Sequence, residues 1–270
     1  MKGPLDQMQR LPEHIARRLN GAVGPEDVLP EPGKNPPVPS VVLFLLGPPW
    51  ARAERGPCLI LNKRSAQVRQ PGDLCCPGGG ISPRLDGGLA RLLRLPGSPL
   101  ARWPHWRRWQ RRWPDPSGRL ALHLATALRE AAEEMRLNPL GVRFLGPMRP
   151  QRLVMFRRVI YPMVGWVGGQ RRFLPNWEVE RIVRIPLGQL LEARRYARYR
   201  FRMEAGGRRH VQDFPCFRLA GPDGRDVLWG ATYRIAVQFL ETVFDFSPPL
   251  METLPVVYGS MDSHYMTGRG

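Results

Sequence analysis

Three glutamates lie within five residues of a chain whose formal net charge is +18. Glu130, Glu133 and Glu134 have the spacing i, i+3 and i+4, which places them on one face of a helix, opposite an apolar face. Like charges at this spacing repel by roughly 0.2–0.5 kcal/mol per pair, whereas a hard divalent cation would be attracted to all three. The spacing therefore favours Mg²⁺-assisted phosphate chemistry, and the alternative is a solvated acidic face.

A basic segment and a glycine loop precede this acidic stretch. Lys63, Arg64 and Arg69 come before the three consecutive glycines Gly78 to Gly80. Guanidinium groups match the geometry of phosphate, so these side chains are candidates for substrate binding, with surface charge at a strand end as the alternative. Glycines let the backbone approach a ligand closely, although this short sequence can also be an ordinary turn.

The elements that would hold these residues can be predicted from apolar patterns. A helix is expected from about Pro116 to Met135, with Asp115 as its N-cap. A second amphipathic helix is expected at 230–244 and shorter ones at 11–19 and 187–194. Strands are expected at 41–46, 58–61, 142–145, 153–167, 181–185, 199–203, 210–219 and 227–229. This order indicates an α+β fold or a three-layer sandwich rather than alternating βαβ units.

The domain organisation follows from composition. Residues 1–39 are expected to be an N-terminal extension with a Pro-rich linker, 40–246 the main domain, and 247–270 a loosely ordered C-terminal tail. Residues 81–116 form an apparent insertion in which Trp103, Trp106, Trp109 and Trp113 alternate with arginines. We expect a lid that packs its tryptophans on the domain; the alternatives are a stacking surface for nucleic acid and a membrane-surface helix.

Composition narrows the class of protein further. The chain is 43% hydrophobic, and its longest apolar run, at 41–46, is far shorter than the ~20 residues that a transmembrane helix needs. Four cysteines without zinc-like spacing and the lack of a secretory leader favour a reduced, cytoplasmic protein. The positive charge would concentrate anionic small-molecule substrates, while nucleic acid is a weaker expectation and a homodimer is left open.

Two motifs together resemble a known family. Arg129 to Leu137, with the sequence Arg-Glu-Ala-Ala-Glu-Glu-Met-Arg-Leu, is similar to the second half of the Nudix box. The segment from Lys63 to Gly79 resembles the additional signature of the coenzyme A pyrophosphatase branch of that superfamily. Further similarity to this branch occurs at 175–187 and 214–232, so that the resemblance spans roughly residues 40–244.

The resemblance implies a Nudix α/β/α sandwich with a mixed sheet and an Mg²⁺- or Mn²⁺-dependent hydrolase. Coenzyme A or its derivatives would be split into 3′,5′-ADP and (acyl-)4′-phosphopantetheine. Glu130, Glu133 and Glu134 would be metal ligands together with a backbone carbonyl of the glycine loop, such as that of Gly79. Arg129 would orient a carboxylate, and either Glu130 or Glu178 would take a proton from the attacking water.

Two positions depart from the family pattern. The glutamate expected eight residues before Arg129 is replaced by Ala121, and the glycine that normally ends the helix is Arg136.

Three other functions are alternatives to a coenzyme A pyrophosphatase. The first is a Nudix hydrolase for another nucleoside diphosphate derivative, such as ADP-ribose, a dinucleotide or an RNA cap. The others are a non-catalytic nucleic-acid-binding module and a protein that docks on membranes through 103–113.

Overall fold

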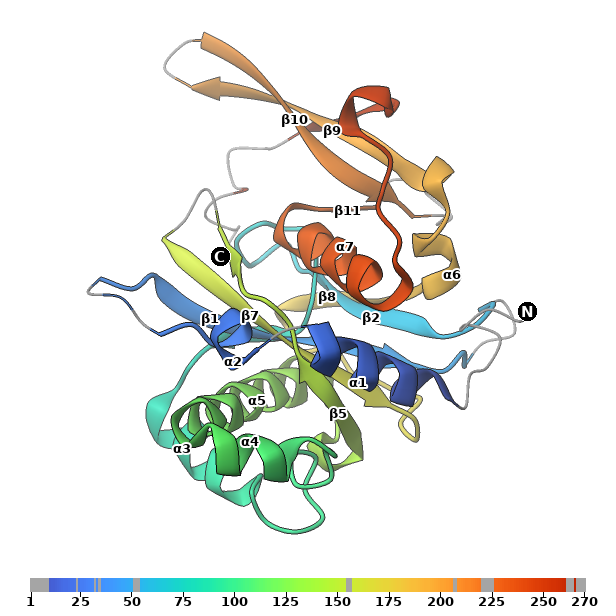
Figure 1. Ribbon diagram of the computed structural model, residues 1–270. Helices are drawn as coiled ribbons and strands as arrows, with labels where there is room; N and C mark the ends of the chain where they lie inside the picture. Colours follow the sequence, from blue (N-terminus) through green and yellow to red (C-terminus); the bar gives the residue numbers. More distant parts are fainter. Residues whose placement is uncertain are drawn as a thin grey trace.

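The computed structural model describes residues 10–22, 24–31, 33, 35–50, 54–153, 157–205, 208–219, 226–260 and 265. An eight-stranded mixed sheet lies between helices on both of its faces (Figure 1). The main path of the sheet is β3 (Leu74–Cys75), β2 (Cys58–Arg64), β1 (Val38–Gly47), β7 (Arg158–Val167) and β5 (Val142–Pro147). Three strands lie off this path: β4 (Gly78–Gly80) pairs with β1, β6 (Gln151–Arg152) with β7, and β8 (Val179–Pro186) with β2.

Strand β1 lies in the middle of the sheet path, and most of its residues are therefore buried on both faces. Its continuous apolar run predicts this burial. It pairs antiparallel with β2, where Leu45 lies opposite Ile60, and parallel with β7. Successive side chains supply different cores: Phe44 and Leu46 point into one apolar cluster, while Leu43 and Leu45 point into the other.

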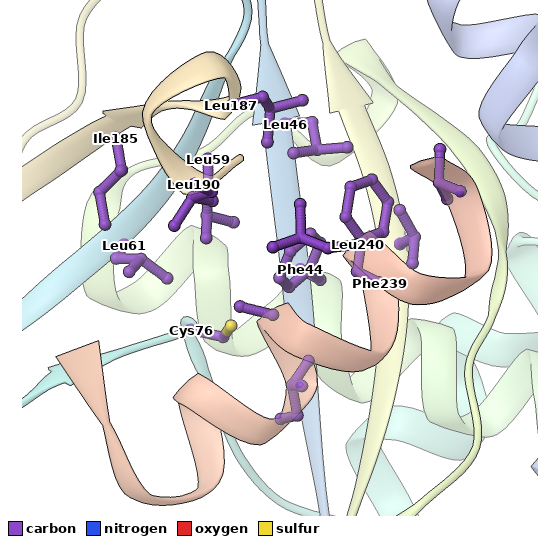
Figure 2. Packing of buried hydrophobic residues seen from close by; sticks show 14 of the residues in the cluster. Phe44, Leu46, Leu59, Leu61, Cys76, Ile185, Leu187, Leu190, Phe239 and Leu240 are labelled. Atoms are coloured by element: carbon purple, nitrogen blue, oxygen red, sulfur yellow. The ribbon is translucent and has the colours of Figure 1, made fainter. Parts of the chain in front are cut away.

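Two helices cover one face of the sheet. α1 (Leu11–Ala22) and α7 (Gly230–Phe244) pack against each other, with His14 Nε2 3.0 Å from the carbonyl of Val243. Figure 2 shows Phe239 and Leu240 of α7 lying over Phe44 and Leu46 of β1. α1 belongs to the predicted N-terminal extension, but its buried residues pack in the same core as the main sheet. The predicted domain boundaries stay a prediction.

The opposite face carries α3 (Pro83–Leu92), α4 (Trp106–Arg112) and α5 (Pro114–Met135), drawn in cyan to green in Figure 1. Trp103, Trp106 and Trp109 are buried in the second apolar cluster against α5 and the sheet. The interpretation that these tryptophans pack on the domain is thus confirmed. Their rings are not free to stack on nucleic acid or to enter a membrane surface.

A second, four-stranded sheet has the order β11 (Val227–Trp229), β10 (Arg208–Arg218), β9 (Tyr196–Ala205) and β12 (Val256–Ser260). β12 runs parallel to β9, so the expectation of a loosely ordered tail is wrong for this segment. Beyond it, Tyr265 Oη donates a hydrogen bond of 2.6 Å to Asp73, the residue that precedes β3. The short elements are α2 (Pro25–Val28), α6 (Leu187–Leu190) and the 3₁₀ turns Pro139–Gly141, Ala193–Arg195 and Met251–Thr253.

The predicted α+β fold with a mixed sheet is confirmed, as are most of its elements. α5 begins at Pro114, so Asp115 is not its N-cap, and the helix predicted at 187–194 is replaced by α6 and a separate 3₁₀ turn. Part of the strand predicted at 153–167 lies outside the described residues. Within the part of the chain that the structure describes, no helix combines the length and apolar character needed to cross a membrane.

Candidate active site

The C-terminal half of α5 lies against the glycine loop, which forms β4. Glu134 is buried there, and its Oε2 accepts hydrogen bonds from the backbone N–H of Gly78 at 3.2 Å and from Asn62 Nδ2 at 2.8 Å. Asn62 belongs to β2, so three elements meet at this carboxyl. The contacts fix one end of the acidic stretch to the sheet.

Glu130 lies one helical turn before Glu134 and faces the next glycine. A Cβ atom added to Gly79 would come within 2.5–2.7 Å of the carboxyl atoms of Glu130, a separation that real Cβ atoms do not adopt. Glycine is therefore required for the Glu130 carboxyl to sit against the loop backbone. The run of glycines predicted a close approach of the backbone to a ligand, whereas the group found against Gly79 is the Glu130 carboxyl.

Arg129 links these carboxylates to the elements around them. Its Nη2 donates to the carbonyl of Gly80 at 3.1 Å and lies 2.9 Å from Glu130 Oε1, while its Nη1 lies 3.3 Å from Glu133. Its Nε donates at 2.6 Å to Asp86, a fully buried residue of α3. Arg129 thus contacts the Glu130 carboxyl, and its role in orienting a catalytic carboxylate stays a prediction.

Burial and mutual repulsion shape the electrostatics of the site. Burial, which is the largest cause, and the neighbouring charges of Glu130 and Glu178 together raise the pKa of Glu134 to about 8, although the Gly78 N–H and Arg64 act in the opposite direction. Burial also raises the pKa of Glu130, although Arg129 opposes this effect. A cation would offset the unfavourable charge at both carboxyls.

We tested whether these residues fit the divalent cation that the resemblance implies. Within the described ranges, no three His, Cys, Asp or Glu side chains are grouped so as to form a metal site on their own. Glu130 and Glu134 nevertheless form an oxygen donor pair beside the loop backbone. The Glu133 side chain is 57% exposed and pairs with Arg129. This donor set fits a hard cation that takes its remaining ligands from water and substrate phosphate.

The chain that follows α5 returns to the same site. Arg136 ends the helix in the left-handed conformation, with φ of 55° and ψ of 35°, where the family pattern has glycine. The backbone N–H of Asn176 then donates to the carbonyl of Glu134 at 2.9 Å, and the Asn176 side chain accepts from the N–H of Glu178. Glu178 is therefore held near Glu134, as its influence on the pKa of Glu134 also indicates.

A cavity of about 360 Å³ adjoins the glycine loop and lies between the two sheets. Gly78, whose N–H binds Glu134, is one of its lining residues. Arg64, Arg158 and Arg234 also line it, and none of these three forms an ion pair with a carboxylate in the described part of the chain. Much of the remaining surface is apolar and comes from Val42, Leu74, Ile160, Phe214, Pro215 and Ile235. The cavity thus combines positive charge with an apolar surface.

The predicted substrate-binding residues have different surroundings. Arg64 lines the cavity, and its Nε donates to the carbonyl of Arg69 at 2.7 Å, while the Arg69 side chain is exposed and outside the cavity lining. Lys63 instead forms ion pairs with Glu180 at 3.3 Å and Asp226 at 3.2 Å. The roles of Lys63 and Arg69 stay predictions.

Sequence reasoning missed several residues of this region. Asp86, Arg158 and Arg234 lie on α3, β7 and α7, well separated in sequence from the acidic stretch of α5. No local signal distinguishes them among 41 basic and 23 acidic residues, since only the fold brings them to the site. Asn62 directly precedes the basic segment in sequence, but its contact with Glu134 is equally a product of the fold.

Sequence comparison finds two curated relatives whose names describe them as Nudix hydrolases. The chain is 32% identical over 123 residues to "Uncharacterized Nudix hydrolase NudL" of Pectobacterium atrosepticum, covering 45% of this chain and 59% of that protein. It is 33% identical over 138 residues to "Nudix hydrolase 22, chloroplastic" of Arabidopsis thaliana, covering 48% and 42%. The chain spans about half the length of these curated relatives. No family model matches the chain.

Solved structures with a similar fold include a MutT/nudix family protein from Enterococcus faecalis. It has a TM-score of 0.42 and 13% identity over 86% of this chain and 74% of that one. A NUDIX hydrolase from Nitrosomonas europaea has a TM-score of 0.40 and 11% identity over 84% and 82%. The two sequence matches make the chain similar to Nudix hydrolases over part of its length. The coenzyme A branch stays a prediction.

Proposed function

Because the chain is related in sequence to the Nudix hydrolases, we propose that it is a metal-dependent pyrophosphohydrolase that cleaves coenzyme A or a derivative of it. The observation that carries this proposal is the position of Glu130 and Glu134 against a glycine loop that also lines a cavity with three arginines. A carboxylate pair beside such a cavity suits a substrate in which a pyrophosphate joins two larger groups.

The cavity supports a substrate with both charged and apolar parts. Arg64, Arg158 and Arg234 can form charge-assisted hydrogen bonds to phosphate oxygens. The apolar lining can accept a nucleobase or the pantetheine arm, which carries little charge. Coenzyme A has a 3′-phosphate in addition to its pyrophosphate, so more than one of these arginines could be used at once.

The chemistry would divide among the residues of the site. Glu130 and Glu134 would hold the cation, which when bound offsets the negative charge of the pyrophosphate and of the leaving phosphate. Arg129 keeps the Glu130 carboxyl beside Gly79 through its 2.9 Å contact. Glu130 and Glu178 are both candidates to remove the proton from water, since each lies close to Glu134.

A substrate panel tests the proposal. Purified protein is incubated with Mg²⁺ or Mn²⁺ and with coenzyme A, acetyl-coenzyme A, ADP-ribose, a dinucleoside polyphosphate or a capped RNA, and products are separated by chromatography. The expected result is release of 3′,5′-ADP from coenzyme A or its acyl form at the highest kcat/KM. A higher kcat/KM for another compound of the panel would change the proposed substrate but not the proposed type of reaction. Folded protein that cleaves none of them would overturn the proposal.

The remaining features of the proposed protein stay predictions. These are the cytoplasmic location, a homodimer, and the description of 81–116 as an insertion in a Nudix domain. The burial of Trp103, Trp106 and Trp109 gives no support to a nucleic-acid-binding module.

A further inference from the structure

Asp86 is a fully buried carboxylate that lies outside the acidic stretch, in the first turn of α3. Its Oδ2 accepts hydrogen bonds from the backbone N–H of Ser82 at 2.7 Å and from Thr126 Oγ1 at 2.8 Å. Arg129 donates to it twice, from Nε at 2.6 Å and from Nη2 at 3.3 Å. This carboxylate of α3 has no exposed surface and is satisfied by polar contacts from α5 and from the residue that precedes α3.

The other side of the Arg129 guanidinium faces the candidate active site. Nη2 contacts both the carbonyl of Gly80 and the carboxyl of Glu130. Because the guanidinium is planar, the two contacts with Asp86 also determine where Nη2 can point. Asp86 is therefore connected, through one rigid group, to the Glu130 carboxyl and to the backbone of the glycine loop.

The position at which a carboxylate was expected cannot provide this connection. Ala121 is fully buried, and its methyl group belongs to the apolar cluster beneath α5. Asp86 lies 43 residues before Arg129 rather than eight, with most of α3, all of α4 and most of α5 between them. It still follows Gly80, so the order of glycine, acidic residue and arginine is kept.

We propose that Asp86 is a positioning residue that takes the place of the carboxylate missing at Ala121, holding Arg129 so that Glu130 faces Gly79. Residues between Asp86 and Arg129 then interrupt a single functional unit whose two parts meet in the fold. The inference rests on the proposed function, since it is the catalytic glutamate that Asp86 positions. Loss of Asp86 would leave the Arg129 guanidinium without its buried partner, free to turn away from Glu130.

Three variants test the inference. Asp86→Asn keeps the size of the side chain but removes the charge, Asp86→Glu keeps the charge with one more methylene, and Asp115→Asn is a matched control at an exposed position in the first turn of α5. Steady-state kinetics are measured with the best substrate of the panel, and Mn²⁺ affinity by electron paramagnetic resonance. Circular dichroism and urea unfolding give the folded fraction of each variant.

Asp86→Asn is expected to lower kcat about 10- to 100-fold with less than about a threefold change in KM, and to weaken Mn²⁺ binding about tenfold. Asp86→Glu should recover part of both losses, and Asp115→Asn should match the wild type. The inference is overturned if Asp86→Asn loses only stability, with the kcat and Mn²⁺ affinity of the folded protein unchanged. Absence of turnover in the folded wild type is a different outcome, which contradicts the proposed function and the inference that rests on it.

Discussion

At the scale of single residues, burial separates the three glutamates of α5 that share a helix face. Glu134 is buried between α5, β2 and the glycine loop, and Glu130 lies against Gly79, whereas the Glu133 side chain is mostly exposed. Desolvation makes the first two carboxylates costly in the charged form unless a positive partner is present. A bound cation would supply that partner. The burial that makes these charged carboxylates unfavourable without a metal therefore favours binding of a cation.

Gly79→Ala should reduce activity through Glu130. The added Cβ would overlap the Glu130 carboxyl, which would have to move away from the loop backbone. We expect kcat for the preferred substrate to fall about 10- to 100-fold, because small displacements of catalytic groups have effects of this size. Gly88→Ala on α3 is the matched control, since a Cβ there meets no atom within 4 Å. Equal activity of the two variants would contradict the role given to Gly79.

His123 should make the stability of the protein depend on pH. Burial, with a smaller effect of Arg119, lowers the pKa of His123 to about 4 from an ordinary 6.5. The unfolded chain therefore binds more protons between these values, so stability from this residue is complete above pH 6.5 and is lost progressively as the pH falls to about 4. The loss amounts to about 3 kcal/mol.

His123→Phe tests this expectation, because phenylalanine can pack on the Tyr161 ring as the imidazole does. Urea unfolding at several pH values should show a smaller loss of stability between pH 6.5 and 4 for the variant than for the wild type. Identical pH profiles would show that His123 does not titrate as the burial indicates.

The residues of the candidate site divide by how far apart they lie in sequence. Arg129, Glu130 and Glu134 could be predicted because one helical turn and one motif bring them together. Asp86, Arg158 and Arg234 could not, since each reaches the site only through packing of distant elements. Lys63 shows the opposite case: its neighbours in sequence favour phosphate binding, but the fold supplies it with two carboxylate partners.

At the scale of elements, α5 ends at Arg136 in the left-handed conformation, which favours glycine. Arg136 has φ of 55°, and its backbone N–H still closes the helix on Ala131 and Ala132. Its carbonyl accepts a 2.8 Å hydrogen bond from Gln170, which helps to hold this turn. The left-handed conformation disfavours any residue with a Cβ by roughly 1 kcal/mol, so the helix end that leads toward Glu178 keeps some strain.

Arg136→Gly is accordingly expected to stabilise the protein by about 0.5–1 kcal/mol. Arg136→Ala is the control, because it removes the exposed side chain but keeps the Cβ. Urea unfolding should give a higher midpoint for the glycine variant than for both the wild type and the alanine variant. A glycine variant no more stable than the alanine variant would show that the turn is not strained.

Elements with strong apolar patterns agreed with prediction, and those defined by long-range pairing did not. Strand β1 and helix α7 were predicted closely because their apolar residues have the period of a buried strand and of an amphipathic helix. Strand β12 was missed because it is short and forms by parallel pairing with β9, some 60 residues away in sequence. The end of α5 was predicted at Met135 in spite of Arg136.

At the scale of the whole molecule, the net charge of +18 and the three cavity arginines act in the same direction. A positive field raises the local concentration of an anionic substrate, and this attraction is screened by salt. We expect kcat/KM to fall as NaCl is raised over the physiological range. A kcat/KM independent of salt would argue against an electrostatic contribution to substrate capture.

Arg158→Gln should raise KM about 3- to 10-fold with little change in kcat, because the residue lines the cavity as a binding group and is not one of the carboxylates assigned to the cation. Arg143→Gln removes the same charge at an exposed position on β5, where the side chain pairs with Glu13. Steady-state kinetics of both variants separate local binding from net charge. Equal KM values for the two variants would show that Arg158 does not contribute to substrate binding.

The measurement that most directly tests the account is the turnover of coenzyme A by Glu134→Gln beside Glu241→Gln. The first variant removes the charge of the buried Glu134 carboxylate with almost no change in size, and the second removes one from the exposed side of α7. With Mg²⁺ present and folding verified by circular dichroism, Glu134→Gln should lose at least about 100-fold in kcat, while Glu241→Gln matches the wild type. A folded Glu134→Gln variant that hydrolyses coenzyme A at the wild-type rate would contradict the assignment of the active site to this helix.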